Sequence, residues 1–232
     1  MSKPQLFCFT YAGGNRDFFN SIAKDLYDVD VCALEYAGHG IRHKEKFYDS
    51  FDELADDMFL QIKDRIYQEY SMFGYSMGSI TLVEVLKRII ESKSPLPSSI
   101  FLAAHEPHTK SELIGFTSDE LDNWVKERTI RFGGVPDKLL NNNAFWRMYL
   151  PLYRADYSLI GKYRFEDLSL TTDISATVFY SEEDTSLEEM KLWKQYFVGN
   201  CDFYRFAGTH FFINEHHEAM AKIIRDKLEI KI

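Results

Sequence analysis

One serine in this chain lies in a pattern typical of an enzymatic nucleophile. Residues Gly74, Tyr75, Ser76, Met77 and Gly78 form the sequence G-x-S-x-G. This motif places a serine on a tight turn between a strand and a helix, with its hydroxyl projecting. A short apolar run precedes the motif and a longer apolar run follows it, so both flanking elements are expected. We therefore predict that Ser76 is a nucleophile that attacks a carbonyl carbon.

A serine hydroxyl is a poor nucleophile unless a base removes its proton and an acidic group orients that base. In enzymes with this turn, the acid and then the base follow the serine along the chain. Asp184 comes shortly after a predicted strand at 176–180, and His210 comes shortly after one at 202–206. Catalytic groups gather at the carboxyl ends of parallel strands. The sequence therefore predicts a triad of Ser76, Asp184 and His210.

Other residues compete for the roles of acid and base. The rival acids are Glu106, Glu182 and Glu183, and the rival bases are His105, His108, His216 and His217. The histidines at 216 and 217 fall within a predicted helix. Those at 105 and 108 follow a predicted strand and could line the site without being the base. The run 105–108 also suggests a metal site, but it lacks recognisable third and fourth ligands, so we expect no bound metal.

The reaction also needs two N–H groups that stabilise the negative oxygen of the tetrahedral intermediate, an oxyanion hole. We predict that Met77, directly after the nucleophile, supplies one of them. The loop at 11–14 follows the first predicted strand and contains two glycines, and Ala12 in this loop is our candidate for the second. Tyr11, Tyr75 and His105 adjoin these groups and are expected to contact the substrate.

The composition indicates one domain that binds neither nucleic acid nor membrane. The chain has 232 residues, of which 45% are hydrophobic, enough for a sizeable core. Its formal charge is −9 and no basic block stands out, which argues against a nucleic-acid partner. The three cysteines are scattered, which is typical of free thiols in a reducing compartment. No signal peptide or membrane span is evident, so we expect a cytoplasmic protein.

Strand-like and helix-like runs alternate along the chain, which predicts an α/β fold with a mostly parallel central sheet flanked by helices. The predicted strands are 5–10, 29–35, 71–75, 99–104, 176–180 and 202–206, and the clearest helices are 51–67 and 215–228. The long interval between the strands ending at 104 and starting at 176 interrupts this alternation. It contains possible helices at 118–129 and 143–149. We interpret 107–165 as a helical lid inserted into the single domain.

Several motifs in order resemble those of the type II thioesterases of nonribosomal peptide and polyketide synthesis, which are stand-alone α/β-hydrolases. Residues 74–78 resemble G-H-S-M-G, 154–157 resemble R-A-D-Y, and 208–212 resemble G-G-H-F-F. Residues 9–14, 36–42 and 132–136 resemble F-P-x-A-G-G, P-P-G-H/R-G-x-R and the G-G-x-P of the lid. The chain departs from these patterns at Thr10, Tyr36, Ala37, Tyr75 and Thr209, beside the predicted triad and not within it.

The resemblance implies hydrolysis of acyl thioesters on the phosphopantetheine arm of carrier domains, through an acyl-enzyme on Ser76. It implies acyl- or peptidyl-carrier domains as partners, no bound cofactor and a monomeric enzyme. Such enzymes clear stalled or wrongly primed acyl groups from a synthase. Two alternatives stay open at this point. One is a general carboxylesterase or acyltransferase acting on free small esters, and the other is an inactive carrier-binding module.

Overall fold

The computed structural model describes residues 3–108 and 117–228, and within them six strands form one fully parallel sheet. The strand order is β2-β1-β3-β4-β5-β6. All six predicted strands are present, with ends that differ by at most two residues: β1 Gln5–Phe9, β2 Asp30–Ala33, β3 Tyr70–Tyr75, β4 Ile100–Ala103, β5 Ala176–Tyr180 and β6 Cys201–Arg205. The predicted parallel sheet is therefore confirmed.

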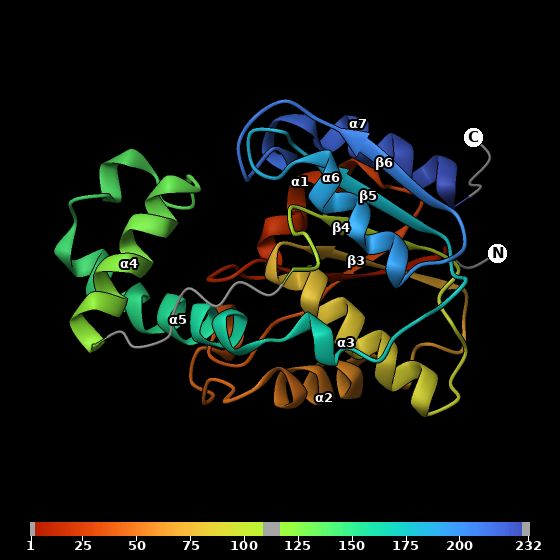
Figure 1. Ribbon diagram of the computed structural model, residues 1–232, viewed down its shortest axis with the longest axis horizontal. Coiled ribbons are helices and arrows are strands. Elements are labelled where there is room, and N and C mark those ends of the chain that lie inside the picture. Colours follow the sequence, from red (N-terminus) through yellow and green to blue (C-terminus); the bar gives the residue numbers. More distant parts are fainter. Residues whose placement is uncertain (1–2, 109–116, 229–232) are drawn as a thin grey trace.

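Helices cover both faces of the sheet (Figure 1). Helices α2 (Phe51–Ile62) and α3 (Met77–Glu91) pack together on one face, and α1 (Asn20–Asp25) and α7 (Ile213–Lys227) pack together on the other. Successive strand side chains point to opposite faces. In β3, Met72 therefore joins the core under α2 and α3, whereas Phe73 and Tyr75 join the core under α1 and α7. A short helix, α6 (Leu187–Met190), follows β5.

Helix α2 ends at Ile62, five residues earlier than the pattern predicted. Residues 63–67 form turns instead, and the Arg65 N–H bonds the Ile62 carbonyl. Ile66 is nevertheless fully buried from within this turn, so the apolar spacing of a helix continues beyond the helix itself. At the other end the Ser50 hydroxyl accepts from the Glu53 N–H, as a helix N-cap does.

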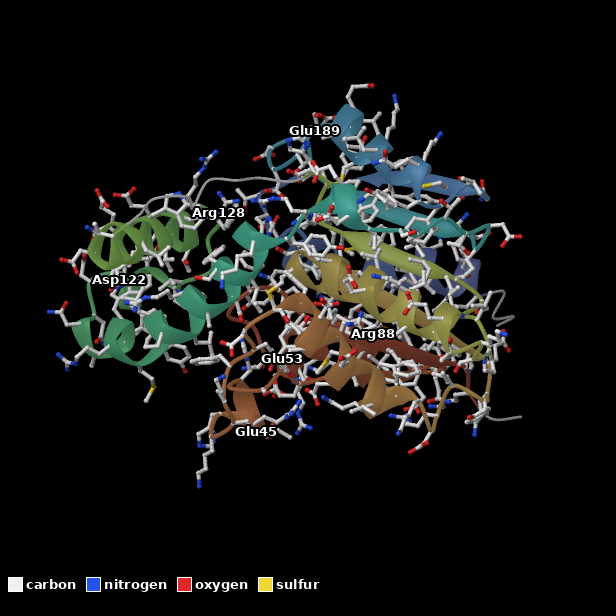
Figure 2. All side chains as sticks on the ribbon, turned by 60° about the horizontal axis from the view of Figure 1, so that its bottom comes forward. Glu45, Glu53, Arg88, Asp122, Arg128 and Glu189 are labelled. Carbon is white, nitrogen blue, oxygen red and sulfur yellow. The ribbon has the colours of Figure 1, made fainter. Side chains whose placement is uncertain are left out.

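The described part of the inserted segment contains two helices that project from one end of the sheet (Figure 1), α4 (Ser118–Arg131) and α5 (Asn143–Lys162). An ion pair between Asp122 and Arg154 links them, and Figure 2 shows Asp122 in the space between the two helices. Helix α5 is much longer than the predicted 143–149 because it continues through Pro151. Proline removes a backbone hydrogen bond there, but one buried face of the helix, which includes Leu150 and Tyr153, runs across the break.

The described residues also form short 3-10 turns at Arg16–Phe19, Gly40–Arg42, Asp137–Leu139, Phe165–Asp167 and Lys191–Gln195. Part of the predicted lid, residues 109–116, lies outside the described residues. No helix in the described part of the chain is long and apolar enough to cross a membrane.

Candidate active site

Ser76 occupies the tight turn between β3 and α3, as its motif predicted. Its backbone has a φ of +55°, in the left-handed region that a serine seldom adopts. The two motif glycines lie where a side chain would collide with the backbone. A Cβ on Gly78 would lie 2.0 Å from the Phe9 carbonyl oxygen, and one on Gly74 would lie 2.3 Å from the Gly78 carbonyl oxygen. The Ser76 N–H donates to the Ala103 carbonyl at 2.8 Å, which ties the turn to β4.

The structure brings Ser76, Asp184 and His210 together although they lie far apart in the sequence. The His210 Nε2 lies 2.9 Å from the Ser76 Oγ, and the His210 Nδ1 lies 2.8 Å from the Asp184 Oδ2. A carboxylate only accepts hydrogen bonds, so Nδ1 carries the proton. The Nε2 lone pair then faces the serine hydroxyl. The His210 and Asp184 side chains are each 8% exposed, so their bond is shielded from water.

Several of the rival acids and bases have other partners. The Glu183 carboxylate accepts from the Gly208 N–H, the Glu106 carboxylate accepts from the Thr185 hydroxyl, and Glu182 lies on the exposed surface. On α7, the histidine at 216 contacts the Ala207 carbonyl and the one at 217 pairs with Asp25. The histidines at 105 and 108 line the cavity beside the serine. Among the described residues, no group of three or more possible ligands could hold a metal ion.

The candidate oxyanion-hole groups lie at the same place in the fold. Met77 is the first residue of α3, and the first N–H groups of a helix have no partner within that helix. Ala12 lies in the loop after β1, where the Gly14 N–H donates to the Tyr11 carbonyl at 3.0 Å and Gly13 has a φ of +81°. Ala12 lines the cavity together with Ser76 and His210.

A cavity of about 360 Å³ opens over the triad and is roofed by the inserted helices. Trp124, Arg128 and Phe132 reach it from α4 and its end, and Tyr153 and Tyr157 reach it from α5. Figure 2 shows Arg128 on the side of α4 that faces the sheet. Its guanidinium lies over the rings of Trp124 and Phe132, 4.9 Å from each centroid. The lid underside is thus rich in aromatic rings, with the Arg128 guanidinium lying among them.

The lid contacts His210 directly. The ring of Phe132 stacks on the imidazole of His210, with centroids 4.3 Å apart and planes inclined by 23°. This contact covers one face of the imidazole and limits its rotation, while Asp184 holds its Nδ1 edge. The sequence placed Phe132 in a lid motif but gave no indication that it would reach the histidine.

Of the three expected substrate contacts, the structure places two in the cavity and one beneath it. Tyr11 and His105 line the cavity. Tyr75 is fully buried in the core, where its hydroxyl donates to the His210 carbonyl at 2.7 Å. Burial raises the pKa of its phenol well above the usual value. Tyr75 therefore supports the histidine backbone from below in place of the substrate contact that we expected.

Comparison with known proteins shows which family this chain belongs to. The thioesterase domain family matches residues 4–228. This chain belongs to that family. The thioesterase is a hydrolase of the α/β-hydrolase fold that acts on thioesters. It is 29% identical over 216 residues to the medium-chain S-acyl fatty acid synthase thioesterase of Rattus norvegicus, covering 90% of this chain and 81% of that protein.

Solved structures extend the match to the type II enzymes. The type II thioesterase BorB of the borrelidin biosynthetic cluster superimposes on this thioesterase with a TM-score of 0.82 and 27% identity, covering 98% of this chain and 93% of that one. RedJ, from the prodiginine pathway of Streptomyces coelicolor, has the same fold, with a TM-score of 0.86, 24% identity and coverage of 97% and 86%. The predicted resemblance to type II thioesterases is therefore confirmed.

Proposed function

We propose that this thioesterase hydrolyses acyl groups from the phosphopantetheine arm of carrier domains, and so frees the carriers of a nonribosomal peptide or polyketide synthase from stalled acyl chains. The observation that carries the proposal is the hydrogen-bonded series Ser76, His210 and Asp184 beneath a lid-covered cavity. Membership of the thioesterase family and the match to BorB support the substrate class.

The geometry supports an acyl-enzyme mechanism in two halves. Ser76 Oγ attacks the thioester carbonyl carbon as its proton passes to His210 Nε2, and the carbonyl oxygen becomes an oxyanion. The N–H groups of Met77 and Ala12 stabilise that oxyanion. The C–S bond then breaks and the thiolate takes the proton from Nε2, which leaves an ester on Ser76. Water, deprotonated by His210, attacks that ester, and the acid leaves as Ser76 regains its proton.

Asp184 keeps the imidazole in the tautomer that these steps require, and it stabilises the imidazolium that forms in each half. The reaction needs no metal and no bound cofactor, because the pantetheine thiol belongs to the substrate. The aromatic underside of the lid offers apolar surface to the acyl chain. The enzyme would act as a monomer that docks transiently on its carrier.

The decisive experiment compares two thioesters of one acyl group. Acetyl-carrier protein and acetyl-pantetheine are hydrolysed by the wild type, by Ser76→Ala and by Ser92→Ala. The last variant is a matched control at the opposite end of α3, where the hydroxyl bonds only the helix end and a neighbouring serine. We expect faster turnover on the carrier, loss of turnover in Ser76→Ala, and normal turnover in Ser92→Ala.

Other results would select a different function. Equal turnover on carrier and free pantetheine would remove carrier recognition and favour a general esterase. No turnover on either substrate by the folded wild type would favour a carrier-binding module without activity. Turnover that survives in Ser76→Ala would refute the acyl-enzyme mechanism.

A further inference from the structure

A buried carboxylate on the lid helix reaches the loop that carries the second oxyanion-hole group. Asp156 lies in α5 and is 2% exposed. Its Oδ2 accepts a hydrogen bond of 2.6 Å from the N–H of Gly13, the residue that follows Ala12. Gly13 and Asp156 are 143 positions apart in the sequence, so this bond fastens the loop to a distant part of the chain.

The same carboxylate oxygen holds a second buried group, His39 from the loop after β2. The His39 Nε2 lies 2.9 Å from the Asp156 Oδ2, and the His39 Nδ1 lies 2.9 Å from the Ala37 carbonyl oxygen. Both partners only accept hydrogen bonds, so both ring nitrogens must carry protons. His39 is therefore an imidazolium paired with an Asp156 carboxylate. Burial lowers the pKa of His39, but the charge and hydrogen bond of Asp156 raise it, and the net shift is upward.

Packing from the lid helix fixes Gly13 as well. A Cβ on Gly13 would lie 2.0 Å from the Cε1 of Tyr153, so the tyrosine ring lies against the glycine backbone. Tyr153 is one helical turn before Asp156, and such residues lie on the same side of a helix. One face of α5 therefore contacts Gly13 through both a ring and a carboxylate.

We propose that Asp156 and His39 act together as positioning residues for the oxyanion hole. Asp156 fixes the direction of the Gly13 peptide and with it that of the neighbouring Ala12 N–H. A carboxylate alone would oppose the negative charge that develops nearby in the transition state. The His39 imidazolium cancels that charge, so the loop is held without electrostatic opposition. This inference rests on the acyl-transfer chemistry proposed above, and it adds two residues, Asp156 and His39, that hold the Ala12 N–H group of its oxyanion hole in place.

The test separates transition-state stabilisation from substrate binding. Asp156→Leu removes the acceptor at similar volume, and Asp156→Asn keeps an oxygen that the Gly13 N–H can use. The control is Asp25→Leu, which breaks an aspartate–histidine pair outside the site, Asp25 with His217, between α1 and α7. Each variant is assayed for kcat and KM on acetyl-pantetheine. Each is also titrated with a pantetheine trifluoromethyl ketone, which forms a tetrahedral adduct on Ser76, and with the matching thioether, which cannot.

We expect Asp156→Leu to lower kcat by about 100-fold with little change in KM, as small misplacements of catalytic groups do. The inhibition constant of the ketone should rise by a similar factor while that of the thioether stays constant. For both kcat and the inhibition constant of the ketone, Asp156→Asn should lie between Asp156→Leu and the wild type. Asp25→Leu should match the wild type in both quantities.

Unchanged kcat in folded Asp156→Leu would overturn the inference, as would equal weakening of the ketone and the thioether, which would indicate a general collapse of the cavity. If Asp156→Leu does not fold, Asp156→Asn decides by the same comparison: selective weakening of the ketone supports the positioning role, and equal weakening refutes it. Activity that persists in Ser76→Ala would instead refute the proposed mechanism itself, so the two failures are distinguishable.

Discussion

The hydroxyl of Tyr75 offers a direct test of how the core supports His210, the proposed catalytic base. It donates to the His210 carbonyl at 2.7 Å from a position that solvent does not reach. Tyr75→Phe removes the donor and leaves a buried carbonyl without this partner. Such a loss costs about 1–3 kcal/mol of unfolding free energy. For a chain of this size the melting temperature should fall by roughly 2–4 °C for each kcal/mol.

Activity should suffer less than stability in Tyr75→Phe. The two ring bonds of His210 and its stacking on Phe132 do not involve the hydroxyl. We therefore expect kcat to fall by less than about tenfold, well below the loss expected when a triad member is removed.

Urea unfolding and acetyl-pantetheine hydrolysis measure the two effects. The control is Tyr27→Phe, because the Tyr27 hydroxyl also has a partner, Arg225, but the residue is exposed. Exposed substitutions of this kind change stability by less than about 0.5 kcal/mol. Equal stability losses in Tyr75→Phe and Tyr27→Phe would refute the argument from burial. A loss of kcat as large as that of a triad variant would show that Tyr75 takes part in the chemistry.

Three further predictions concern the acid, the turn and the buried ion pair. Asp184→Asn should lower kcat by about 10⁴-fold with the protein still folded, because the imidazole loses its orienting carboxylate; near-normal kcat would return the role of acid to Glu106, Glu182 or Glu183. Gly78→Ala should lower the free energy of urea unfolding by more than about 2 kcal/mol, because the added Cβ collides with the Phe9 carbonyl oxygen. Unchanged stability would show that the turn can relax. The folded-state pKa of His39 is raised by Asp156, with a smaller contribution from Glu35, and Tyr36 lies in ring contact with the imidazole. The ion pair of His39 with Asp156 therefore stabilises the fold fully below about pH 6.5, the pKa of a free histidine, and this stabilisation is lost as pH rises through the raised pKa of His39. The stability difference between the wild type and His39→Gln should therefore shrink as pH rises, and a constant difference would contradict the charged pair.

The sequence could predict those parts of the site that depend on local pattern. Ser76 has a motif, and Asp184 and His210 each follow a strand whose end lies at the same sheet edge. The motif, the order of the residues along the chain and the positions of the strand ends were therefore enough to predict all three. The position of Tyr75 was also predictable, since alternation along β3 places it on the same face as Phe73. We expected a substrate contact because its neighbour in the motif is the nucleophile.

Contacts between distant segments could not be predicted in this way. The bonds of Asp156 to Gly13 and His39 span 143 and 117 positions, and no local pattern shows which of many carboxylates is buried against which loop. Helix ends were misjudged for a related reason. Burial of Ile66 from a turn mimics helical spacing beyond α2, and tertiary packing carries α5 through Pro151.

The contacts between α5 and Gly13 have a consequence for redesigning substrate preference. An engineer who wants a different acyl group would exchange the lid for that of a relative, treating it as an independent module. In this chain the lid is not an independent module, because Tyr153 and Asp156 belong to it by sequence but contact Gly13 in the loop after β1. A graft that ends before Tyr153 exchanges the roof and retains these contacts. A graft that extends beyond Asp156 also replaces them, so the donor would have to supply an equivalent ring and carboxylate at the same two positions.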